Sequence, residues 1–514
     1  MNEGMQPPPI IWAIGGSDSG GGAGIQADSQ AIRAHGGHPC TAITTITAQN
    51  SRQIAASEAV SLELLRAQLD ALYQDLPPCA IKIGLLANGE QARLLARWLH
   101  GWRANHPGVK VVLDPVLRSG QGQPLASTDL LPILRSELLP LVDLLTPNLP
   151  ELAALCGRHQ ISPDPASWLP LADQLRHSGA GAVLIKGGHS QPWQGLAVDL
   201  LVSGDGRFWF GGEWLNARHS HGSGCTLAAA IATRLGRGDA LADAVACGRA
   251  YLQRGLRLAV GLGQGPGPVA QGEASLHPAD QPRCALTLGE LSHHAEPAPR
   301  CPQHLGLYPV LPDCDWLQRA LAAGARTVQL RLKSSNAPLI DHQVASAVAL
   351  GQRYRARVVI NDHWQAAIRH GAWGVHLGQE DLAMADLSAI RRAGLRLGLS
   401  THGRFELLRA LALRPSYVAI GHLFPTTTKQ MASRPQGLGR LREQLQLLAG
   451  RLPAVAIGGI DAARIAEVVA CGVAGVALVS AITAASQPEL ALAQLLAAAG
   501  QGEPEPAAMA EVSP

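Results

Sequence analysis

The second half of the chain repeats one pattern eight times, a short apolar stretch of strand type followed by a helical stretch. The apolar stretches are residues 307–311, 327–333, 357–362, 374–378, 396–402, 416–422, 454–459 and 475–481. Eight consecutive strand–helix units predict a (β/α)8 barrel, the TIM barrel, over residues 305–500. The residues that follow the strands should then form one ligand-binding mouth.

Polar and charged residues occupy those strand ends. Gln329, Arg331 and Lys333 alternate along the second strand, and a period of two directs all three into the barrel. Cations opposite carboxylates suit a magnesium-bound pyrophosphate, and the candidates are Arg331, Lys333, Lys429, Asp362 and Asp381. Small residues after the last two strands are the usual monophosphate site of this fold. We therefore expect two phosphorylated substrates, although each residue alone could be a solvated loop position.

Residues 10–265 alternate strand and helix patterns in a different way. Strand-type stretches lie at 10–14, 42–48, 80–86, 109–114, 141–146, 182–186 and 197–202, and helical stretches separate most of them. This arrangement predicts an α/β domain whose mainly parallel sheet is covered on both faces. Ligands of such domains bind where the strands end.

Two glycine-rich segments stand out in this domain. Residues 15–24 follow the first strand, and residues 221–226 open an alanine-rich helix. Glycine allows close backbone approach, and the free N–H groups and dipole of a helix N-terminus attract anions, so the second segment predicts a phosphate cradle. The same field should lower the pKa of the Cys225 thiol, which could act as base or nucleophile. The alternative is a glycine-rich helix start with a small packing cysteine.

Polar residues also gather at the strand ends of the first half. The Gln49 carboxamide carries a donor beside an acceptor and can read an aminopyrimidine edge. Asp114 and Glu151 offer oxygen ligands of the kind that Mg²⁺ accepts. Lys186 and the glycines after it supply a cation and flexible backbone for phosphate. Each could singly be a helix cap or turn residue, but their joint occurrence favours a ligand site.

Composition excludes several other classes of protein. The 514 residues carry a net charge of only +3 and no basic stripe, so we expect no nucleic-acid partner. Nine cysteines without C-x-x-C spacing argue for a reducing compartment and against disulfides or zinc. No apolar run reaches membrane-spanning length, so we expect a cytoplasmic protein without a membrane partner. A homo-oligomer is compatible with the sequence. Residues 266–304 are predicted to form a flexible linker and residues 501–514 a disordered tail.

The first half resembles the bifunctional hydroxymethylpyrimidine kinase/phosphomethylpyrimidine kinase family of thiamine biosynthesis. Residues 15–28, 48–50, 114–116, 146–148, 186–189 and 222–226 carry the resemblance, in the family's order. It implies a ribokinase-like three-layer α/β/α domain that uses ATP and Mg²⁺, with Cys225 as the base. It further implies pyrimidine binding by Gln49, Asp28, Gly16 and Ala23, ATP or phosphate binding by Asn148, Lys186, Gly188, Gly222 and Gly224, and Mg²⁺ binding by Asp114 and Glu151.

The second half resembles thiamine phosphate synthase through residues 329–333, 361–362, 374–381, 400–402, 425–429, 458–460 and 479–480. The resemblance implies that Arg331 and Lys429 assist catalysis and that Asp362 and Asp381 bind Mg²⁺. It implies a pyrimidine pyrophosphate site formed by Gln329, Leu330, Arg331, Leu332, Lys333, Asn361, Ser400 and Lys429. The implied thiazole phosphate site consists of Thr426, Thr427, Thr428, Gly459, Val479 and Ser480. Leu332 and His363 stand where the family often has Glu and Arg.

Together the two resemblances imply three successive steps on small-molecule substrates. Hydroxymethylpyrimidine would be phosphorylated twice with ATP, and the pyrophosphate product would condense with thiazole phosphate to give thiamine phosphate. Three alternatives stay open from the sequence. The first domain could be a pyridoxal-type kinase, the barrel could be a thiazole tautomerase-like isomerase or a phosphate-binding regulator, and the chain could be a scaffold.

Overall fold

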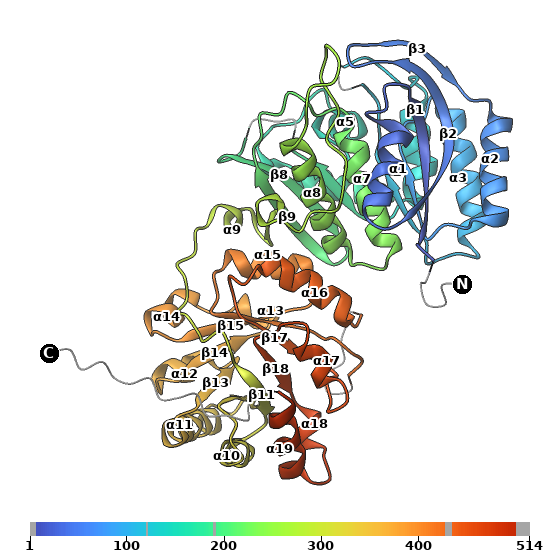
Figure 1. Cartoon of the computed structure of the whole chain (residues 1–514). Helices are drawn as coiled ribbons and strands as arrows, with labels where there is room; N and C mark the ends of the chain where they lie inside the picture. The colour runs from blue at the N-terminus through green and yellow to red at the C-terminus, as the bar shows by residue number, and fades with distance from the viewer. Residues whose placement is uncertain (1–6, 120–121, 189–191, 427–433, 500–514) are drawn as a thin grey trace. The chain divides into compact units, whose positions relative to one another are not determined.

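The computed structural model describes residues 7–119, 122–188, 192–426 and 434–499. It divides into two compact units, Met1–His293 and His294–Pro514, which we call unit 1 and unit 2 (Figure 1). In the part of the chain described, no helix combines the length and the apolar character that crossing a membrane requires.

Unit 1 is built on one ten-stranded sheet with the order β10-β9-β8-β7-β6-β5-β4-β1-β2-β3. Six central strands are parallel: β1 (Ile10–Asp18), β2 (His38–Gln49), β4 (Ala80–Ile83), β5 (Lys110–Leu113), β6 (Leu144–Leu145) and β7 (Val183–Lys186). The antiparallel strands are β3 (Ile54–Ala59), β8 (Leu196–Ser203), β9 (Gly206–Glu213) and β10 (Arg283–Ala285). The mainly parallel sheet is thus present, with antiparallel edges that the sequence did not indicate.

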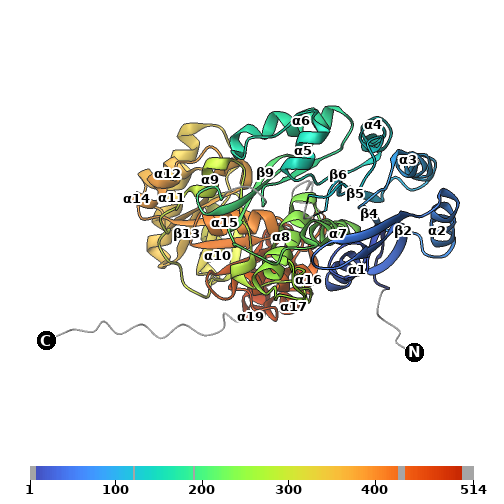
Figure 2. The same cartoon turned by 90° about the horizontal axis from the view of Figure 1, so that it is seen from above.

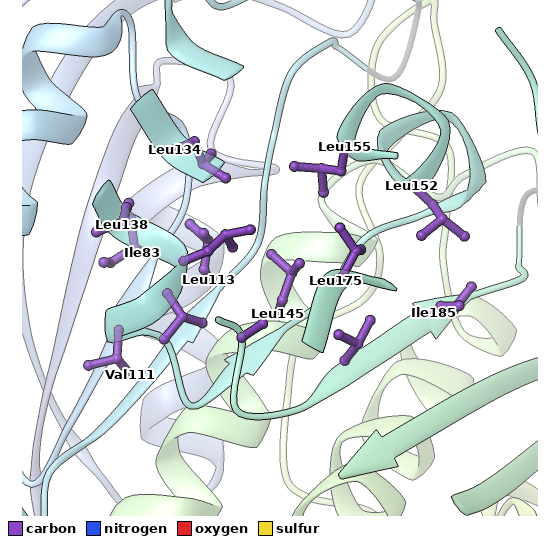
Figure 3. Packing of buried hydrophobic residues seen from close by; sticks show 14 of the residues in the cluster. Ile83, Val111, Leu113, Leu134, Leu138, Leu145, Leu152, Leu155, Leu175 and Ile185 are labelled. Atoms are coloured by element: carbon purple, nitrogen blue, oxygen red, sulfur yellow. The ribbon is translucent and has the colours of Figure 1, made fainter. Parts of the chain in front are cut away.

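Helices cover both faces of this sheet, as the sequence predicts. On one face lie α1 (Gly24–Ala34), α7 (Ser223–Gly236) and α8 (Leu241–Arg257), and on the other α2 (Leu62–Asp75), α3 (Gly89–Arg103), α4 (Leu130–Ile133), α5 (Leu149–Leu155) and α6 (Leu169–His177) (Figure 2). Leucines of α5 and α6, with Leu134 and Leu138, pack on the strand residues Ile83, Leu113 and Leu145 (Figure 3). The ribokinase-like three-layer α/β/α architecture is confirmed.

Strand β1 extends further than its apolar residues suggest. The predicted strand ends at Ile14, whereas β1 continues through the first glycines to Asp18 and stays paired with β2. The register shifts between Gly15 and Gly16, because glycine accommodates the local bend of a bulge. Asp18 therefore lies at the carboxyl end of a central strand, where it faces the glycine-rich turn.

The prediction of a flexible linker over residues 266–304 is wrong. His221 forms a bridge with Pro268, β10 pairs with β9, and Leu291 of α9 (Leu288–Ser292) is buried in the core of unit 1. Towards unit 2, the Ala298 amide donates to the Arg414 carbonyl and the Ser416 hydroxyl to the Pro299 carbonyl. The glycines and prolines of this stretch form fixed turns because their backbone groups find partners on the two units.

Unit 2 is a closed barrel of eight parallel strands that follow one another in order, which confirms the TIM barrel. Its strands are β11 (Gly306–Leu311), β12 (Thr327–Leu330), β13 (Arg357–Asn361), β14 (Gly374–Leu377), β15 (Arg396–Thr401), β16 (Tyr417–Ile420), β17 (Ala454–Ile457) and β18 (Gly475–Leu478). The helices are α10 (Cys314–Ala322), α11 (Ala337–Tyr354), α12 (Trp364–Arg369), α13 (Gln379–Leu382), α14 (Leu387–Arg392), α15 (Arg404–Ala412), α16 (Gly437–Leu448), α17 (Ile465–Val469), α18 (Ser480–Thr483) and α19 (Pro488–Ala498).

One boundary in the barrel differs from the prediction. Strand β12 ends at Leu330, so Arg331 and Lys333 belong to the loop after it rather than to the strand. Gln329 is buried and Lys333 is exposed. The prediction that Gln329, Arg331 and Lys333 alternate along one strand and all point into the barrel is therefore wrong. All three residues still lie at the end of β12 or just after it.

Candidate active sites

The N-terminus of α7 meets the glycine-rich turn of β1 backbone to backbone. Gly222 has a φ of +80°, and a Cβ atom there would lie 1.9 Å from the carbonyl oxygen of Gly22. Gly24 has a φ of +56°, and its Cβ would lie 2.2 Å from the carbonyl oxygen of Gly16. Only glycine allows this approach, so the two segments form one surface of backbone groups at the start of α7.

Asp18 organises the glycine-rich turn from within. Its carboxylate accepts hydrogen bonds from the N–H groups of Gly20 (2.8 Å), Gly22 (3.1 Å) and Ala23 (2.9 Å), and it lies 3.0 Å from His221 Nε2. Burial raises the pKa of Asp18, but the bonds from His221 and the backbone outweigh it and hold the pKa below its ordinary value. Gln49 Nε2 lies 3.1 Å from His221 Nε2.

Neither Asp18 nor His221 is among the residues predicted for the site. Both adjoin the glycine segments, and a carboxylate beside several free N–H groups is the only signal that could have indicated them. The Ala23 amide, predicted to hold the pyrimidine, already donates to Asp18.

Asp114 and Lys186 meet at the carboxyl ends of β5 and β7. Lys186 Nζ lies 2.6 Å from Asp114 Oδ1, which also accepts a bond of 3.0 Å from the Thr146 hydroxyl. A Cβ atom on Gly224 would lie 3.1 Å from Asp114 Oδ2, so the start of α7 borders this ion pair. Burial raises the pKa of Asp114, but the ammonium groups of Lys186 and Lys82 outweigh it and lower the pKa. The structure thus brings together Lys186 and Gly224 of the predicted phosphate site and Asp114 of the predicted metal site.

Asn148 and Glu151 form the capping box of α5. The Glu151 amide donates to Asn148 Oδ1 and the Asn148 amide to Glu151 Oε2, each at 2.9 Å. Burial, opposed by the nearby Lys186 cation, raises the pKa of Glu151 to about 7. The helix-cap alternative therefore applies to both residues, and any part in binding ATP or Mg²⁺ is additional to it. Gly188, which was predicted to bind ATP or phosphate, lies in a loop where an added Cβ atom would have no neighbour within 4 Å.

Asp28 is fully buried and forms an ion pair of 2.8 Å with Lys82. Burial raises its pKa to about 6 against the opposing effect of Lys82, and its Oδ1 atom has no hydrogen-bond partner. The predicted direct contact of Asp28 with a pyrimidine does not fit a side chain that solvent cannot reach. The ion pair instead lies beneath the start of α7, close enough to Cys225 for both charges to affect its thiol.

Replacing Lys82 by methionine is expected to lower the free energy of unfolding of unit 1 by about 3–5 kcal/mol, because it leaves the buried carboxylate of Asp28 without its ion-pair partner. The measurement is urea unfolding of the full chain, followed through the transition of unit 1. Arg66→Met is the matched control, since its ion pair with Asp70 is exposed and 3.8 Å long. Equal losses in the two variants would contradict this interpretation.

The pKa of Cys225 moves opposite to the prediction. Burial raises it to about 11, and the lowering effect of Lys82 is insufficient to reverse this. The field of the helix N-terminus acts on the thiol, but desolvation of the thiolate and the carboxylates of Asp28 and Asp114 outweigh it. The free protein therefore holds Cys225 as a thiol.

We expect Cys225 to react with iodoacetamide at pH 7.5 more slowly than the exposed Cys79, because the thiolate is the reactive form. Peptide mass spectrometry after timed alkylation compares the two sites within one sample. Faster modification of Cys225 would show that the thiol is activated before substrates bind.

In unit 2, Asp362 and Asp381 form a carboxylate pair beside Gly378 at the barrel mouth. Asp362 has a φ of +63°, and the Asn361 amide group donates to its carboxylate. Burial and the neighbouring charge of Asp381 raise the pKa of Asp362 to about 7, against the lowering effect of Arg331. Two carboxylates that repel one another fit a divalent cation, which would neutralise both.

The barrel interior holds a polar network that includes two predicted residues. Gln329 Nε2 donates to the Tyr308 hydroxyl at 3.1 Å, and the hydroxyls of Tyr308 and Tyr417 lie 2.7 Å apart. His376 lies 3.1 Å from the Tyr417 hydroxyl and 2.8 Å from the Ser400 hydroxyl. Burial lowers the pKa of His376 to about 4, so it is neutral at physiological pH. Tyr308, Tyr417 and His376 were missed because they lie inside predicted strand stretches rather than at the strand ends, where candidates were sought.

The remaining predicted residues lie in loops after the strands. Gly458 and Gly459 have φ values of +98° and +66°, and a Cβ atom on Gly459 would lie 2.5 Å from the Pro425 carbonyl oxygen. Val479 and Ser480 follow β18, and Thr426 follows β16. Thr427, Thr428 and Lys429 lie outside the described residues. His363 Nε2 lies 3.1 Å from the Leu332 carbonyl oxygen, so the two positions that depart from the family pattern contact each other.

Among the described residues no group of three or more His, Cys, Asp and Glu side chains could hold a metal ion. Pairs of carboxylates are present instead, and a phosphate ligand would have to complete their coordination. The Asp362–Asp381 pair fits such a site better than Asp114 and Glu151, whose oxygens are bound by Lys186, Thr146 and Asn148.

Two family models match the chain, one in each unit. The model for phosphomethylpyrimidine kinase matches residues 18–270, and that for thiamine monophosphate synthase matches residues 307–482. Thiamine-phosphate synthases of Escherichia coli O1:K1 and Shigella flexneri are each 56% identical over 202 residues, which is 39% of this chain and 95% of each relative. The chain belongs to both families. It is a bifunctional transferase of thiamine biosynthesis, with a kinase unit (unit 1) and a synthase unit (unit 2).

Solved structures similar to the kinase unit include phosphomethylpyrimidine kinase from Clostridium difficile, at 30% identity and a TM-score of 0.40, covering 47% of this chain and 98% of that one. An ADP complex of Bacillus subtilis pyridoxal kinase is 27% identical, with a TM-score of 0.47 and coverage of 51% and 97%. The curated relatives of the synthase unit are synthases, which disfavours the isomerase and regulator alternatives for the barrel.

Proposed function

We propose that the kinase unit phosphorylates 4-amino-5-hydroxymethyl-2-methylpyrimidine twice with ATP, and that the synthase unit condenses the resulting pyrophosphate with thiazole phosphate. Thiamine phosphate and inorganic pyrophosphate are the products. One unit makes the substrate of the other, which explains their fusion. Small molecules are then the only partners needed for activity, and the cytoplasmic location stays a prediction.

The kinase assignment is supported most by the meeting of two glycine segments at α7 beside the Asp114–Lys186 pair. In-line phosphoryl transfer needs positioning and neutralisation of the equatorial oxygens rather than covalent chemistry. The N–H groups of Gly224 and Cys225 would bind the transferred phosphoryl group, and Lys186 would bind a nucleotide phosphate. Cys225 would accept the proton of the substrate hydroxymethyl group. With a thiol pKa near 11 in the free protein, this step requires the phosphates and the metal to change the local charge.

Loss of pyrophosphate in the synthase unit leaves a pyrimidine methylene cation, which the thiazole nitrogen captures. Arg331 and Lys429 would stabilise the departing pyrophosphate, and Gln329 and Ser400 would hold the pyrimidine within the polar network. Asp362 and Asp381 would hold Mg²⁺. When bound, Mg²⁺ neutralises charge on the leaving group. The small residues Gly459 and Ser480 would leave room for the thiazole phosphate.

A coupled assay tests this proposal. Purified full-length protein receives the hydroxymethylpyrimidine, MgATP and thiazole phosphate, and products are separated by chromatography. Wild type should form thiamine phosphate, Cys225→Ala should leave the pyrimidine unphosphorylated, and Lys429→Ala should accumulate pyrimidine pyrophosphate. If wild type stops at the pyrophosphate, the synthase role is wrong. If it prefers pyridoxal, the pyridoxal-kinase alternative for unit 1 is correct.

A further inference from the structure

We infer that His221 is a positioning residue that fixes the orientation of the Gln49 carboxamide and thereby makes the kinase unit select substrates that carry the 4-amino group. The inference rests on the proposed function, because it requires Gln49 to face the pyrimidine. It gives a role to the contact between His221 and Gln49, which lie 172 positions apart in the chain.

The His221 ring is held in place from two sides. A Cβ atom on Gly22 would lie 2.6 Å from His221 Cδ2, so the ring lies directly against the glycine turn. The His221 amide donates to the Gly267 carbonyl at 3.2 Å, and the His221 carbonyl accepts from the Val269 amide at 3.0 Å. The backbone bonds fix the main chain of His221, and the glycine turn limits the ring on one side.

Asp18 determines which atom of His221 carries a proton. Its Oδ2 atom lies 3.0 Å from His221 Nε2 and also accepts from the amides of Gly22 and Ala23. The side chain of Asp18 is 5% exposed and, with these donors around it, ionised, so it can only accept. Nε2 must therefore donate, whether the imidazole is neutral or protonated.

This proton determines the orientation of Gln49. With Gln49 Nε2 at 3.1 Å from His221 Nε2, two donors would face each other. A half-turn of the carboxamide, whose oxygen and nitrogen are interchangeable in shape, places the carbonyl oxygen against His221. The carbonyl oxygen and Asp18 then share the single Nε2–H proton in a three-centre bond, and two donors no longer face each other.

Thr47 independently requires the same half-turn. Its hydroxyl donates its single proton to the Ser17 carbonyl at 2.9 Å. At 3.4 Å from the other amide atom of Gln49, the Thr47 oxygen can only accept, so it needs the NH2 group there. Both neighbours thus specify one orientation, with the carbonyl towards His221 and the NH2 towards Thr47.

A Gln49 carboxamide held in one orientation recognises one arrangement of hydrogen-bond donor and acceptor on the ligand. Its carbonyl can accept from the 4-amino group while its NH2 donates to the neighbouring ring nitrogen of the pyrimidine. A ring without the amino group leaves the carbonyl without this donor, and a site built for such a hydrogen bond rejects a ligand that lacks it. Without the His221 donor, only the 3.4 Å contact with Thr47 favours this orientation. A bond of that length is too weak to hold the carboxamide, so the group can rotate and accept either ligand.

The experiment measures kcat and KM of the full-length protein for the aminopyrimidine and for 5-hydroxymethyl-2-methylpyrimidine, its analogue without the amino group, at saturating ATP. For His221→Leu and His221→Asn we expect the kcat/KM ratio of the two substrates to fall at least about tenfold, mainly through a higher KM for the aminopyrimidine. His221→Gln should keep the ratio within about threefold, because its terminal NH2 can donate to Asp18 from the position of Nε2.

His219→Leu is the matched control. His219 Nδ1 accepts at 2.9 Å from the backbone amide of Gly267, the residue whose carbonyl accepts from the His221 amide. Within the described part of the chain, His219 forms no hydrogen bond with Gln49 or Asp18. A ratio that stays unchanged in His221→Leu and His221→Asn, or a kcat that falls equally on both substrates, overturns the inference. A wild type that is inactive on the aminopyrimidine overturns the proposed function, and this inference with it.

Discussion

Replacing Gly222 by alanine is expected to lower the kinase kcat/KM by about 100-fold or more, because misplacing a reacting centre by 1 Å costs this much. The new methyl group would lie 1.9 Å from the Gly22 carbonyl oxygen, and the residue would hold a φ of +80°. Both force the start of α7 away from the glycine turn, and the N–H groups that should bind the transferred phosphoryl group move with it. The measurement is the initial rate of pyrimidine phosphorylation in the full-length variant.

Two controls separate this effect from general damage. Gly157→Ala introduces the same backbone strain at a φ of +68° but meets no atom within 4 Å. It should retain nearly all kinase activity. The synthase rate of Gly222→Ala, measured with supplied pyrimidine pyrophosphate, should equal that of wild type. A Gly222→Ala kinase as active as Gly157→Ala would show that the contact between the glycine segments is not required.

Replacing Asp362 by asparagine is expected to lower the synthase kcat/KM by about 100-fold, since a metal ion contributes several kcal/mol to stabilising the leaving charge. A pH dependence should accompany this loss. Because the Asp362 pKa is raised to about 7, the carboxyl is increasingly protonated as the pH falls below 7 and must release its proton to bind a cation. In wild type, the Mg²⁺ concentration for half-maximal rate should therefore rise about tenfold per pH unit below 7.

Glu380→Gln serves as the matched control, because it removes one charge next to Asp381 from an exposed side chain. Its rate and its Mg²⁺ requirement should match those of wild type. If Asp362→Asn behaves like Glu380→Gln, or if the Mg²⁺ requirement of wild type is constant from pH 6 to 8, the carboxylate pair does not hold the metal.

The sequence predicted the elements whose pattern is local. All eight barrel strands lie within the predicted stretches or a residue beyond them, because each is a short apolar run followed by a helix. The glycine segments were equally visible, since only glycine leaves room for the close backbone contacts made at Gly24 and Gly222. Strand β3 was not, because its residues Ile54–Ala59 are mostly exposed and lack apolar alternation.

The sequence could not predict interactions between distant residues. The Asp28–Lys82 pair spans 54 positions and the Asp18–His221 contact 203, and neither has a signature at short range. The error over Cys225 has the same origin. Its position in the first turn of a helix predicts a lowered pKa. Burial and the carboxylates of Asp28 in α1 and Asp114 after β5 raise the pKa instead, and these residues are far away in the sequence.

The packing of residues 266–292 on the sheet of unit 1 determines how the two activities can be separated. A kinase fragment ending at residue 265 would lose the Val269 contact with His221 and the edge strand β10, and would expose the backbone of β9 to pairing with other chains. Ala295 is buried and belongs to unit 2, whereas α9 ends at Ser292 in unit 1. A cut in the short stretch between them would leave both modules intact. Genetic dissection, or comparison with kinases encoded separately, should therefore count these residues as part of the kinase module.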